Sequence, residues 1–266
     1  MDKNVLIALL LTAFAGLATG IGSAIAFLAK QTNKRILTFS LGLSAGVMIY
    51  VSFVEIFAKA EESLTIAYGN KIGLSLTVTF FFAGMLLVAL IDKLVPSVEN
   101  PHEIRSVESI NQEPPKDNLM KMGMLTAIAI AIHNFPEGIA TFIGALEDPA
   151  LGVALALAIA IHNIPEGIAV AIPIYYATGS RKKAFCYSFL SGLAEPIGAI
   201  IAYLILMPFI NPVVIGCVFA LIGGVMVFIS LDELLPAAHK YGEHHIAVYG
   251  VVAGMLIMAV SLVALA

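Results

Sequence analysis

Long apolar runs separated by short polar segments are the dominant pattern of this chain. A transmembrane helix needs roughly 20 consecutive apolar residues, and runs of about that length recur along the whole sequence. We predict eight spans, at about residues 5–28, 36–58, 72–95, 119–146, 150–177, 184–207, 213–235 and 246–266. The pattern therefore predicts an all-α, polytopic membrane protein that forms a single domain over residues 1–266.

The first apolar run is expected to remain in the protein as a membrane helix. A single lysine, Lys3, precedes it, and it lacks the small-residue cleavage site that ends a secretory signal peptide. Residues 5–28 are therefore counted as the first span.

The longest polar segment, residues 96–118, separates the third and fourth spans and is predicted to be a cytoplasmic loop. It is mildly acidic and contains four prolines, a composition typical of segments with little fixed structure. Its one histidine, His102, is compatible with metal sensing, but a solvated linker is the favoured interpretation.

The distribution of lysine and arginine predicts the orientation, because short cytoplasmic loops are enriched in both. If the N-terminus lies outside, only Lys3, Lys59 and Lys71 fall on the outer side, and the other eleven of the 14 lysines and arginines fall on the inner side. The sequence therefore predicts that both termini lie outside.

Composition excludes several classes of protein. Hydrophobic residues make up 60% of the chain and charged residues 12%, whereas about 25% of a soluble domain is charged. The net charge of −4, with no basic arm, gives no sign of nucleic-acid binding. Two cysteines, Cys186 and Cys217, are too few for a disulfide framework or a CxxC metal site, and we predict that both are buried thiols.

One motif occurs twice in the middle of the chain. The first copy is His133-Asn134-Phe135-Pro136-Glu137-Gly138, and the second is His162-Asn163-Ile164-Pro165-Glu166-Gly167. On a helix, the histidine and glutamate at i and i+4 share one face, and the asparagine lies three residues before the glutamate. Each copy therefore directs one nitrogen and several oxygens toward one point, which is the chemistry of a metal ligand set.

Three glutamates, Glu137, Glu166 and Glu195, fall within predicted spans. A charged residue at the centre of a bilayer costs roughly 2.5–3.5 kcal/mol on insertion scales. No lysine or arginine lies at that depth to neutralise them. We therefore expect a divalent cation, bound protons or a wet cavity to stabilise these carboxylates.

Each motif also holds a proline inside its predicted helix. Pro136 and Pro165 lack an amide hydrogen, so the carbonyls of Ile132 and Ile161 lose their helical partners. Such breaks are tolerated in membranes where the freed backbone lines a cavity or meets polar groups. An ordinary proline kink would explain one motif, but two copies at the same depth favour a site.

A second internal repeat links the second and seventh spans. Residues 48–55, MIYVSFVE, match residues 226–233, MVFISLDE, and Gly46 aligns with Gly224. The two spans run in opposite directions, so we predict a 3+2+3 arrangement of inverted repeats, an architecture typical of secondary transporters. The pairs Gly16/Gly20 and Gly42/Gly46 predict close helix seams.

Several other polar or polarisable positions in spans 2 and 7 are candidates for a transport pathway. These are Met48, Ser52, Glu55, Ser230, Asp232 and Glu233. Helix–helix hydrogen bonding explains the serines equally well, and placement at the membrane interface explains the carboxylates. Glu55 is expected near the outer end of span 2. His239, His244 and His245 lie between spans 7 and 8, where a solvated loop is favoured over a metal site.

The paired HNxPEG motifs, Glu195-Pro196 and the eight spans together resemble the ZIP (Zrt/Irt-like) divalent-metal transporters. The resemblance implies import of zinc, and also iron, manganese and cobalt, into the cytoplasm across a bacterial cytoplasmic (inner) membrane. It further implies a two-metal centre between spans 4 and 5. One site would use His133, Glu137, His162 and Glu166, and the other Asn134, Glu137, Asn163, Glu166 and Glu195. Met48 matches the span-2 residue that adds a ligand in relatives, whereas the long histidine-rich 3–4 loop of many relatives is missing here.

The metals are expected to bind as substrates, with no cofactor, and mixed nitrogen and oxygen ligands without thiolates argue against Cu(I). The expected partners are the divalent ions and the lipid bilayer, with a homodimer as one oligomeric state and no nucleic acid. The main alternative is a membrane-embedded di-metal carboxylate enzyme, although no further catalytic set is visible. A metal-stabilised structural protein is a third class. An intramembrane HExxH protease is excluded, because asparagine follows each histidine.

Overall fold

The computed structural model describes residues 3–28, 34–94, 116–241 and 244–265, and every regular element in these ranges is helical. In chain order, the first half comprises α1 (Lys3–Leu28), α2 (Lys34–Val51), the π-helical segment η1 (Ser52–Ile56), α3 (Phe57–Tyr68), α4 (Asn70–Leu94) and α5 (Lys116–Glu147). The second half comprises α6 (Pro149–Thr178), α7 (Arg181–Gly192), α8 (Ala194–Ile201), the π-helical η3 (Ala202–Leu206), the 3-10 turn η4 (Met207–Phe209), α9 (Pro212–Ile229), the π-helical η5 (Ser230–Leu234), α10 (Leu235–Tyr241) and α11 (His244–Leu265). Most of the predicted 96–118 loop, including His102, lies outside the described residues.

The prediction of an all-α membrane protein is confirmed. Within the described ranges, seven helices are long and apolar enough to cross a bilayer: Lys3–Ala24, Thr38–Tyr68, Asn70–Ile91, Pro149–Ile168, Arg181–Phe209, Pro212–Leu234 and His244–Ala264. The remaining predicted span, 119–146, falls in α5, a helix of 32 residues that is not among the seven.

The helix that contains the second predicted span extends beyond the predicted end of that span. The helix does not stop near residue 58 but continues through α2, η1 and α3 to Tyr68, where Gly69 turns the chain at φ 78°. Residues 57–68 carry charges that mark the end of an apolar run, yet they are good helix formers, and Ala60 and Leu64 are buried against neighbouring helices. Glu55 therefore lies inside a long helix rather than near its end.

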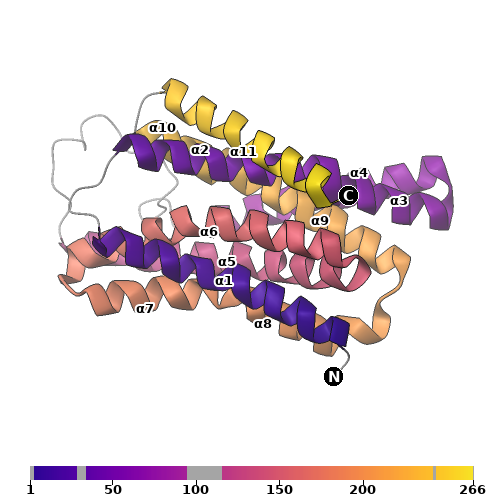
Figure 1. The fold of residues 1–266 in the computed structure, drawn as a ribbon, viewed down its shortest axis with the longest axis horizontal. Coiled ribbons are helices and arrows are strands. Elements are labelled where there is room, and N and C mark those ends of the chain that lie inside the picture. Colours follow the sequence, from indigo (N-terminus) through magenta and orange to yellow (C-terminus); the bar gives the residue numbers. More distant parts are fainter. Residues whose placement is uncertain (1–2, 29–33, 95–115, 242–243, 266) are drawn as a thin grey trace.

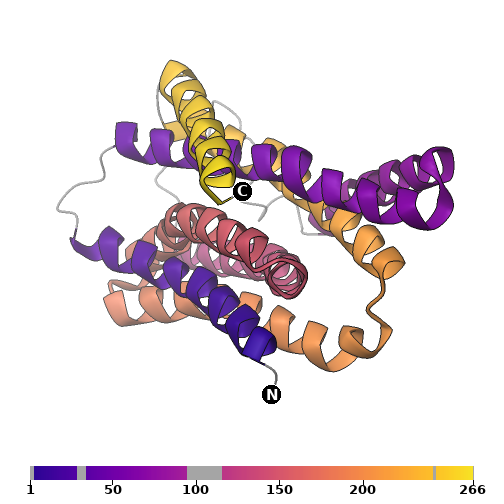
Figure 2. The ribbon, with the colours of Figure 1, turned by 45° about the vertical axis from the view of Figure 1, so that its right-hand side comes forward.

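The bundle is built around α5 and α6. Helix α6 packs against α1 and α5, and α5 also packs against α8, while α2 packs against α11 and α4 packs against α9. Figure 2 shows α5 and α6 in the middle, with α7 and α8 (orange) on one side and α2 and α11 (purple and yellow) on the other. The start of α1 and the end of α11 lie at the same end of the bundle (Figure 1).

Glycines let helix backbones touch along the seam between α2 and α11. A side-chain carbon at Gly42 would collide with the carbonyl of Ala247, and one at Gly46 would collide with that of Val251. The predicted Gly42/Gly46 seam is therefore confirmed.

The seam between α4 and α9 is built in the same way. A carbon at Gly84 would collide with the carbonyl of Leu221, and one at Gly224 would collide with that of Phe81. Contacts this close allow dispersion and backbone packing to hold helices together in lipid, where no hydrophobic force does so.

The two copies of the second repeat share an irregular turn. Both η1 and η5 begin at the serine of the repeat, and both are π-helical. Ser52 donates a hydrogen bond to the carbonyl of Met48 at 2.6 Å, and Ser230 donates one to Met226 at 2.8 Å. These hydroxyls bond within their own helices, so the helix–helix hydrogen bonds considered for them are not what the structure shows. Serine bonding of this kind competes with the backbone ladder and distorts helices.

The prediction of two buried thiols is wrong. Cys186 is exposed on α7, and Cys217 on α9 is only partly buried. The reason is physical, since an apolar residue of a membrane helix can face lipid as readily as protein. Hydropathy alone does not distinguish these two environments.

Candidate metal centre

The motif residues meet at the interface between the two central helices. Asn134 and Glu137 lie on α5, and His162, Asn163 and Glu166 lie on α6. All five are buried, with at most 2% of their surface exposed. The side chain of His133 lies outside the described part of the structure, although its place on α5 is described.

His162 joins the two carboxylates of the predicted first site. Its Nε2 lies 3.2 Å from Oε2 of Glu137 on the neighbouring helix and 3.8 Å from Oε1 of Glu166 on its own helix. Ligands of one zinc ion, each about 2.0–2.2 Å from it, are separated by distances of this order. His162 therefore lies beside a carboxylate from each of the two central helices.

The asparagines are held by their amide nitrogens. Asn163 donates to the carbonyl of Ala15 on α1 at 2.9 Å and also to Glu195 on α8, and Asn134 donates to the carbonyl of Ser191 on α7 at 3.4 Å. The contact between Asn163 and Glu195 brings together two members of the predicted second site.

Three buried oxygens are left over by these bonds. Within the described residues, Oδ1 of Asn134, Oδ1 of Asn163 and Oε1 of Glu137 accept no hydrogen bond. An unsatisfied buried polar group costs about 1–3 kcal/mol, and amide and carboxylate oxygens are ligands for hard and borderline cations. The donor set therefore fits a metal ion.

The arrangement is not a closed ligand cage. In the ranges that the structure describes, no three His, Cys, Asp or Glu side chains are set to hold a metal ion outright. The structure brings together Glu137, His162 and Glu166, and separately Asn163 and Glu195, but it does not test His133.

The glycine that ends each motif positions the helix beside it. A side-chain carbon at Gly138 would collide with the carbonyl of Glu195, and one at Gly167 would collide with that of Thr19. Gly138 therefore lets α8 approach closely enough to place Glu195 beside the motif. Sequence reasoning recognised these glycines only as part of the motif.

The candidate pathway residues fall into two groups. Met48, Ser52 and Ser230 are fully buried, whereas Glu55, Asp232 and Glu233 are partly buried. Met48 belongs to the main apolar core. Its role as a ligand stays a prediction.

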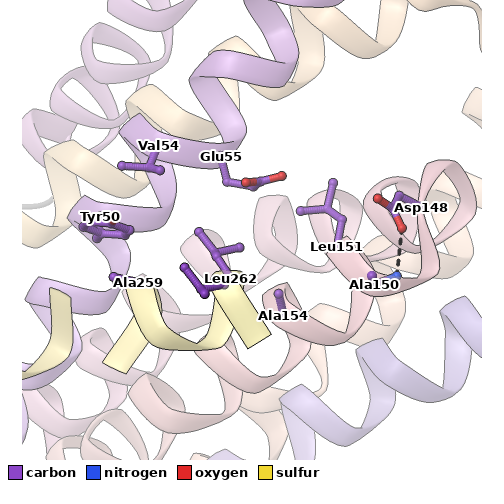
Figure 3. A pocket seen from close by; sticks show the side chains of 10 residues that line it. Tyr50, Val54, Glu55, Asp148, Ala150, Leu151, Ala154, Ala259 and Leu262 are labelled. Carbon is purple, nitrogen blue, oxygen red and sulfur yellow. Dashed lines mark hydrogen bonds between the residues drawn. The ribbon is translucent and has the colours of Figure 1, made fainter. Parts of the chain in front are cut away.

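Glu55 points into a cavity of about 340 Å³ (Figure 3). Residues of η1, the start of α6 and the end of α11 line it, and a second carboxylate, Asp148, faces it. Asp148 also caps α6, accepting a hydrogen bond from the amide of Ala150 at 2.9 Å. Sequence reasoning missed Asp148, although an acidic residue before Pro149, at the same end of the bundle as Glu55, was an available signal.

The helices are long enough to cross a bilayer, and they enclose buried imidazole, carboxylate and amide groups, with an acidic cavity at one end. These features indicate an integral membrane protein whose buried groups suit cations. Residues 75–262 match the family model described as ZIP Zinc transporter. Relatives named Zinc transporter ZupT match nearly the whole chain. One from Streptococcus mutans is 63% identical over 262 residues, covering 98% of each chain. Another, from Oceanobacillus iheyensis, is 64% identical over 266 residues, covering 99% of each. A third, from Lysinibacillus sphaericus, is 62% identical over 268 residues and covers all of both chains.

The chain belongs to the ZIP zinc-transporter family. It is a multi-pass membrane protein that transports divalent metal, and it is not an enzyme. The alternative of a membrane-embedded di-metal enzyme is therefore set aside.

Proposed function

We propose that this protein imports divalent metal cations, with zinc as the main substrate and iron, manganese and cobalt as further ones, into the cytoplasm. The observation that carries the proposal is the position of His162 between Glu137 and Glu166, at the buried contact of the two central helices. Residues 122–180 contain no lysine or arginine, so no basic side chain of this stretch neutralises the carboxylates, and a metal cation or protons are proposed to do so.

The proposed site is binuclear and lies between α5 and α6. The first metal would be held by His133, Glu137, His162 and Glu166. The second would be held by Asn134, Glu137, Asn163, Glu166 and Glu195, with Glu137 and Glu166 bridging. The unpartnered oxygens of Asn134 and Asn163 and the contact of Asn163 with Glu195 support the second site.

The proposed architecture is eight spans in a 3+2+3 inverted repeat. Matched glycine seams support it, because Gly46 on α2 and Gly224 on α9 approach the backbones of α11 and α4 in the same way. The π-helical turns η1 and η5 at matched positions also support it. The ends of α1 and α11 on one side of the bundle agree with an even number of crossings (Figure 1).

The proposed orientation places both termini outside a bacterial cytoplasmic (inner) membrane. The lysine and arginine distribution supports the orientation. The bacterial origin of the relatives supports the kind of membrane. The cavity with Glu55 and Asp148 then forms the outer mouth, and metal leaves the midplane site past Asp232 and Glu233.

The surfaces of α4 and α11 are proposed to contact lipid or the second copy in a homodimer. Only 17% of the spanning window of α4 and 22% of that of α11 are buried within the protein.

The proposed metal selectivity follows from nitrogen and oxygen ligands without thiolates, which suit Zn(II), Fe(II), Mn(II) and Co(II) but not Cu(I).

Metal influx into proteoliposomes tests the proposal. Vesicles that hold wild-type protein and an internal zinc reporter should show uptake that saturates with external Zn²⁺. Glu166→Ala, reconstituted to the same density, should show only the leak of empty vesicles. Glu62→Ala, which changes an exposed residue of α3, is the matched control and should behave as wild type. Uptake by Glu166→Ala at the wild-type rate would contradict the proposal.

A further inference from the structure

Three histidines gather where α10 meets α11, away from the midplane site. The rings of His239 on α10 and His244 at the start of α11 are stacked, with centroids 4.8 Å apart and planes at 17°. His245 lies edge-on to His244 at 5.5 Å, and Tyr249 stacks on His245 at 6.3 Å. This cluster lies at the opposite end of the bundle from the end of α11 (Figure 1).

The stacked pair has the chemistry of a metal site. Imidazole is the commonest side-chain ligand for zinc and its neighbours in the first transition row. His239 and His244 are both exposed, so their rings can change rotamer without disturbing a packed core. At this separation, rotation of the rings can direct one nitrogen of each to a single ion at about 2.0–2.1 Å.

Such a site would be open rather than caged. Within the described residues, no third His, Cys, Asp or Glu side chain completes a ligand group here, and water fills the other positions of the site that we envisage. A zinc site that keeps water-filled positions exchanges ligands readily, which suits transient binding.

The position of His239 relates the pair to the proposed metal route. His239 on α10 follows Asp232 on η5 by seven residues, which is about 10 Å along the helix axis. In the proposed orientation, α10 and the start of α11 lie at the inner end of the protein.

We propose that His239 and His244 form a second binding site for a divalent cation, completed by water, which accepts metal leaving the midplane site. The role as an acceptor rests on the proposed import function, but metal binding by the pair does not.

The binding test uses the full-length protein in nanodiscs with the midplane site disabled by Glu137→Ala and Glu166→Ala. Equilibrium dialysis against Zn²⁺ should show about one bound equivalent per chain. His239→Phe or His244→Phe, each of which keeps an aromatic ring for stacking, should weaken that binding at least about tenfold. Tyr249→Phe is the matched control and should leave it unchanged. The proposed site would be overturned by unchanged Zn²⁺ binding in both histidine variants. It would also be overturned if the protein with the disabled midplane site bound no Zn²⁺.

The role in transport is tested separately, in protein with an intact midplane site. His239→Phe should lower the maximal rate of Zn²⁺ uptake while leaving KM at the outer side unchanged. A maximal rate equal to that of wild type would overturn the acceptor role. If the wild type itself does not transport, while the disabled background still binds Zn²⁺ through His239, the import proposal fails and the histidine site stands.

Discussion

In Asn134 and Asn163, the nitrogen and the oxygen of the side-chain amide have different roles. Each uses its amide nitrogen to bond another helix, so in the proposed site each side chain is already oriented for an ion. The amide oxygen of each asparagine is buried and accepts no hydrogen bond within the described residues. Fixed orientation of this kind lowers the entropy lost when a ligand binds.

Replacement of Asn163 tests this division. Asn163→Ala removes both the oxygen and the nitrogen that bonds Ala15 and Glu195. We expect Zn²⁺ affinity to fall by roughly 10–100-fold, the range found when groups that support a metal site are removed. Isothermal titration of the purified protein measures the affinity. Wild-type affinity would show that Asn163 only ties α6 to α1.

Gly138 allows a test of how closely α8 must approach. An added methyl group collides with the backbone carbonyl of Glu195, which cannot move without shifting the helix. Gly138→Ala should therefore cost about 1–3 kcal/mol, the usual penalty of overpacking, and should also weaken metal binding.

Gly20→Ala is the control for that variant. Its nearest neighbour is the ring of Phe189, at 3.1 Å, which can rotate away. Thermal unfolding in detergent should show a clear loss for Gly138→Ala and a smaller one for Gly20→Ala. Equal losses would mean that the backbone contact at Gly138 is unimportant.

At the scale of elements, the cavity beside Glu55 is lined by two carboxylates from different helices. Glu55 lies in the π-helical turn η1, and Asp148 precedes the first turn of α6. Acidic groups that line a cavity raise the local concentration of cations and speed their entry, an effect that salt screens.

The variant Asp148→Asn separates the effect of the negative charge in the cavity from the effect of the cap at the start of α6. Asparagine caps a helix as well as aspartate does, so α6 should keep its start while the cavity loses one charge. We expect KM for Zn²⁺ uptake to rise severalfold, with little change in the maximal rate. The difference from wild type should shrink as ionic strength rises. An unchanged KM at low salt would remove Asp148 from the entry path.

The limits of sequence reasoning also lie mostly at this scale. The repeated motif located His162, Glu137 and Glu166 because identical local spacing produces identical helix faces. The continuation of α2 to Tyr68 was missed, because charged residues that end an apolar run do not end a helix. Asp148 joins Glu55 only because η1 and the start of α6 line the same cavity, which no local pattern reports.

The same limit applies to surfaces. Hydropathy identifies a span but not which side of it meets lipid, so the environments of Cys186 and Cys217 were predicted wrongly. The stacking of His239 on His244 depends on how α10 and α11 pack against each other. Sequence alone could place both residues in one connecting segment but not in contact.

At the scale of the whole molecule, the topology is open to a direct test. The start of α1 and the end of α11 lie at the same end of the bundle (Figure 1), and the positive charges predict that this end is outside. Alkaline phosphatase fused to the C-terminus should therefore be active in bacterial cells, and a green fluorescent protein fusion should be dark. A bright fluorescent fusion with an inactive phosphatase would reverse the orientation, and with it the assignment of the outer cavity.

The central claim is that a divalent ion binds between α5 and α6 at Glu137, His162 and Glu166. A crystal of the protein grown with Zn²⁺, measured at the zinc absorption edge, tests it most directly. The account predicts an anomalous difference peak within about 2.2 Å of a nitrogen of His162 and of a carboxylate oxygen from each helix. The peak should be missing in Glu166→Ala crystals grown in the same way. Zinc peaks only elsewhere, in wild-type protein that still transports zinc, would contradict the account.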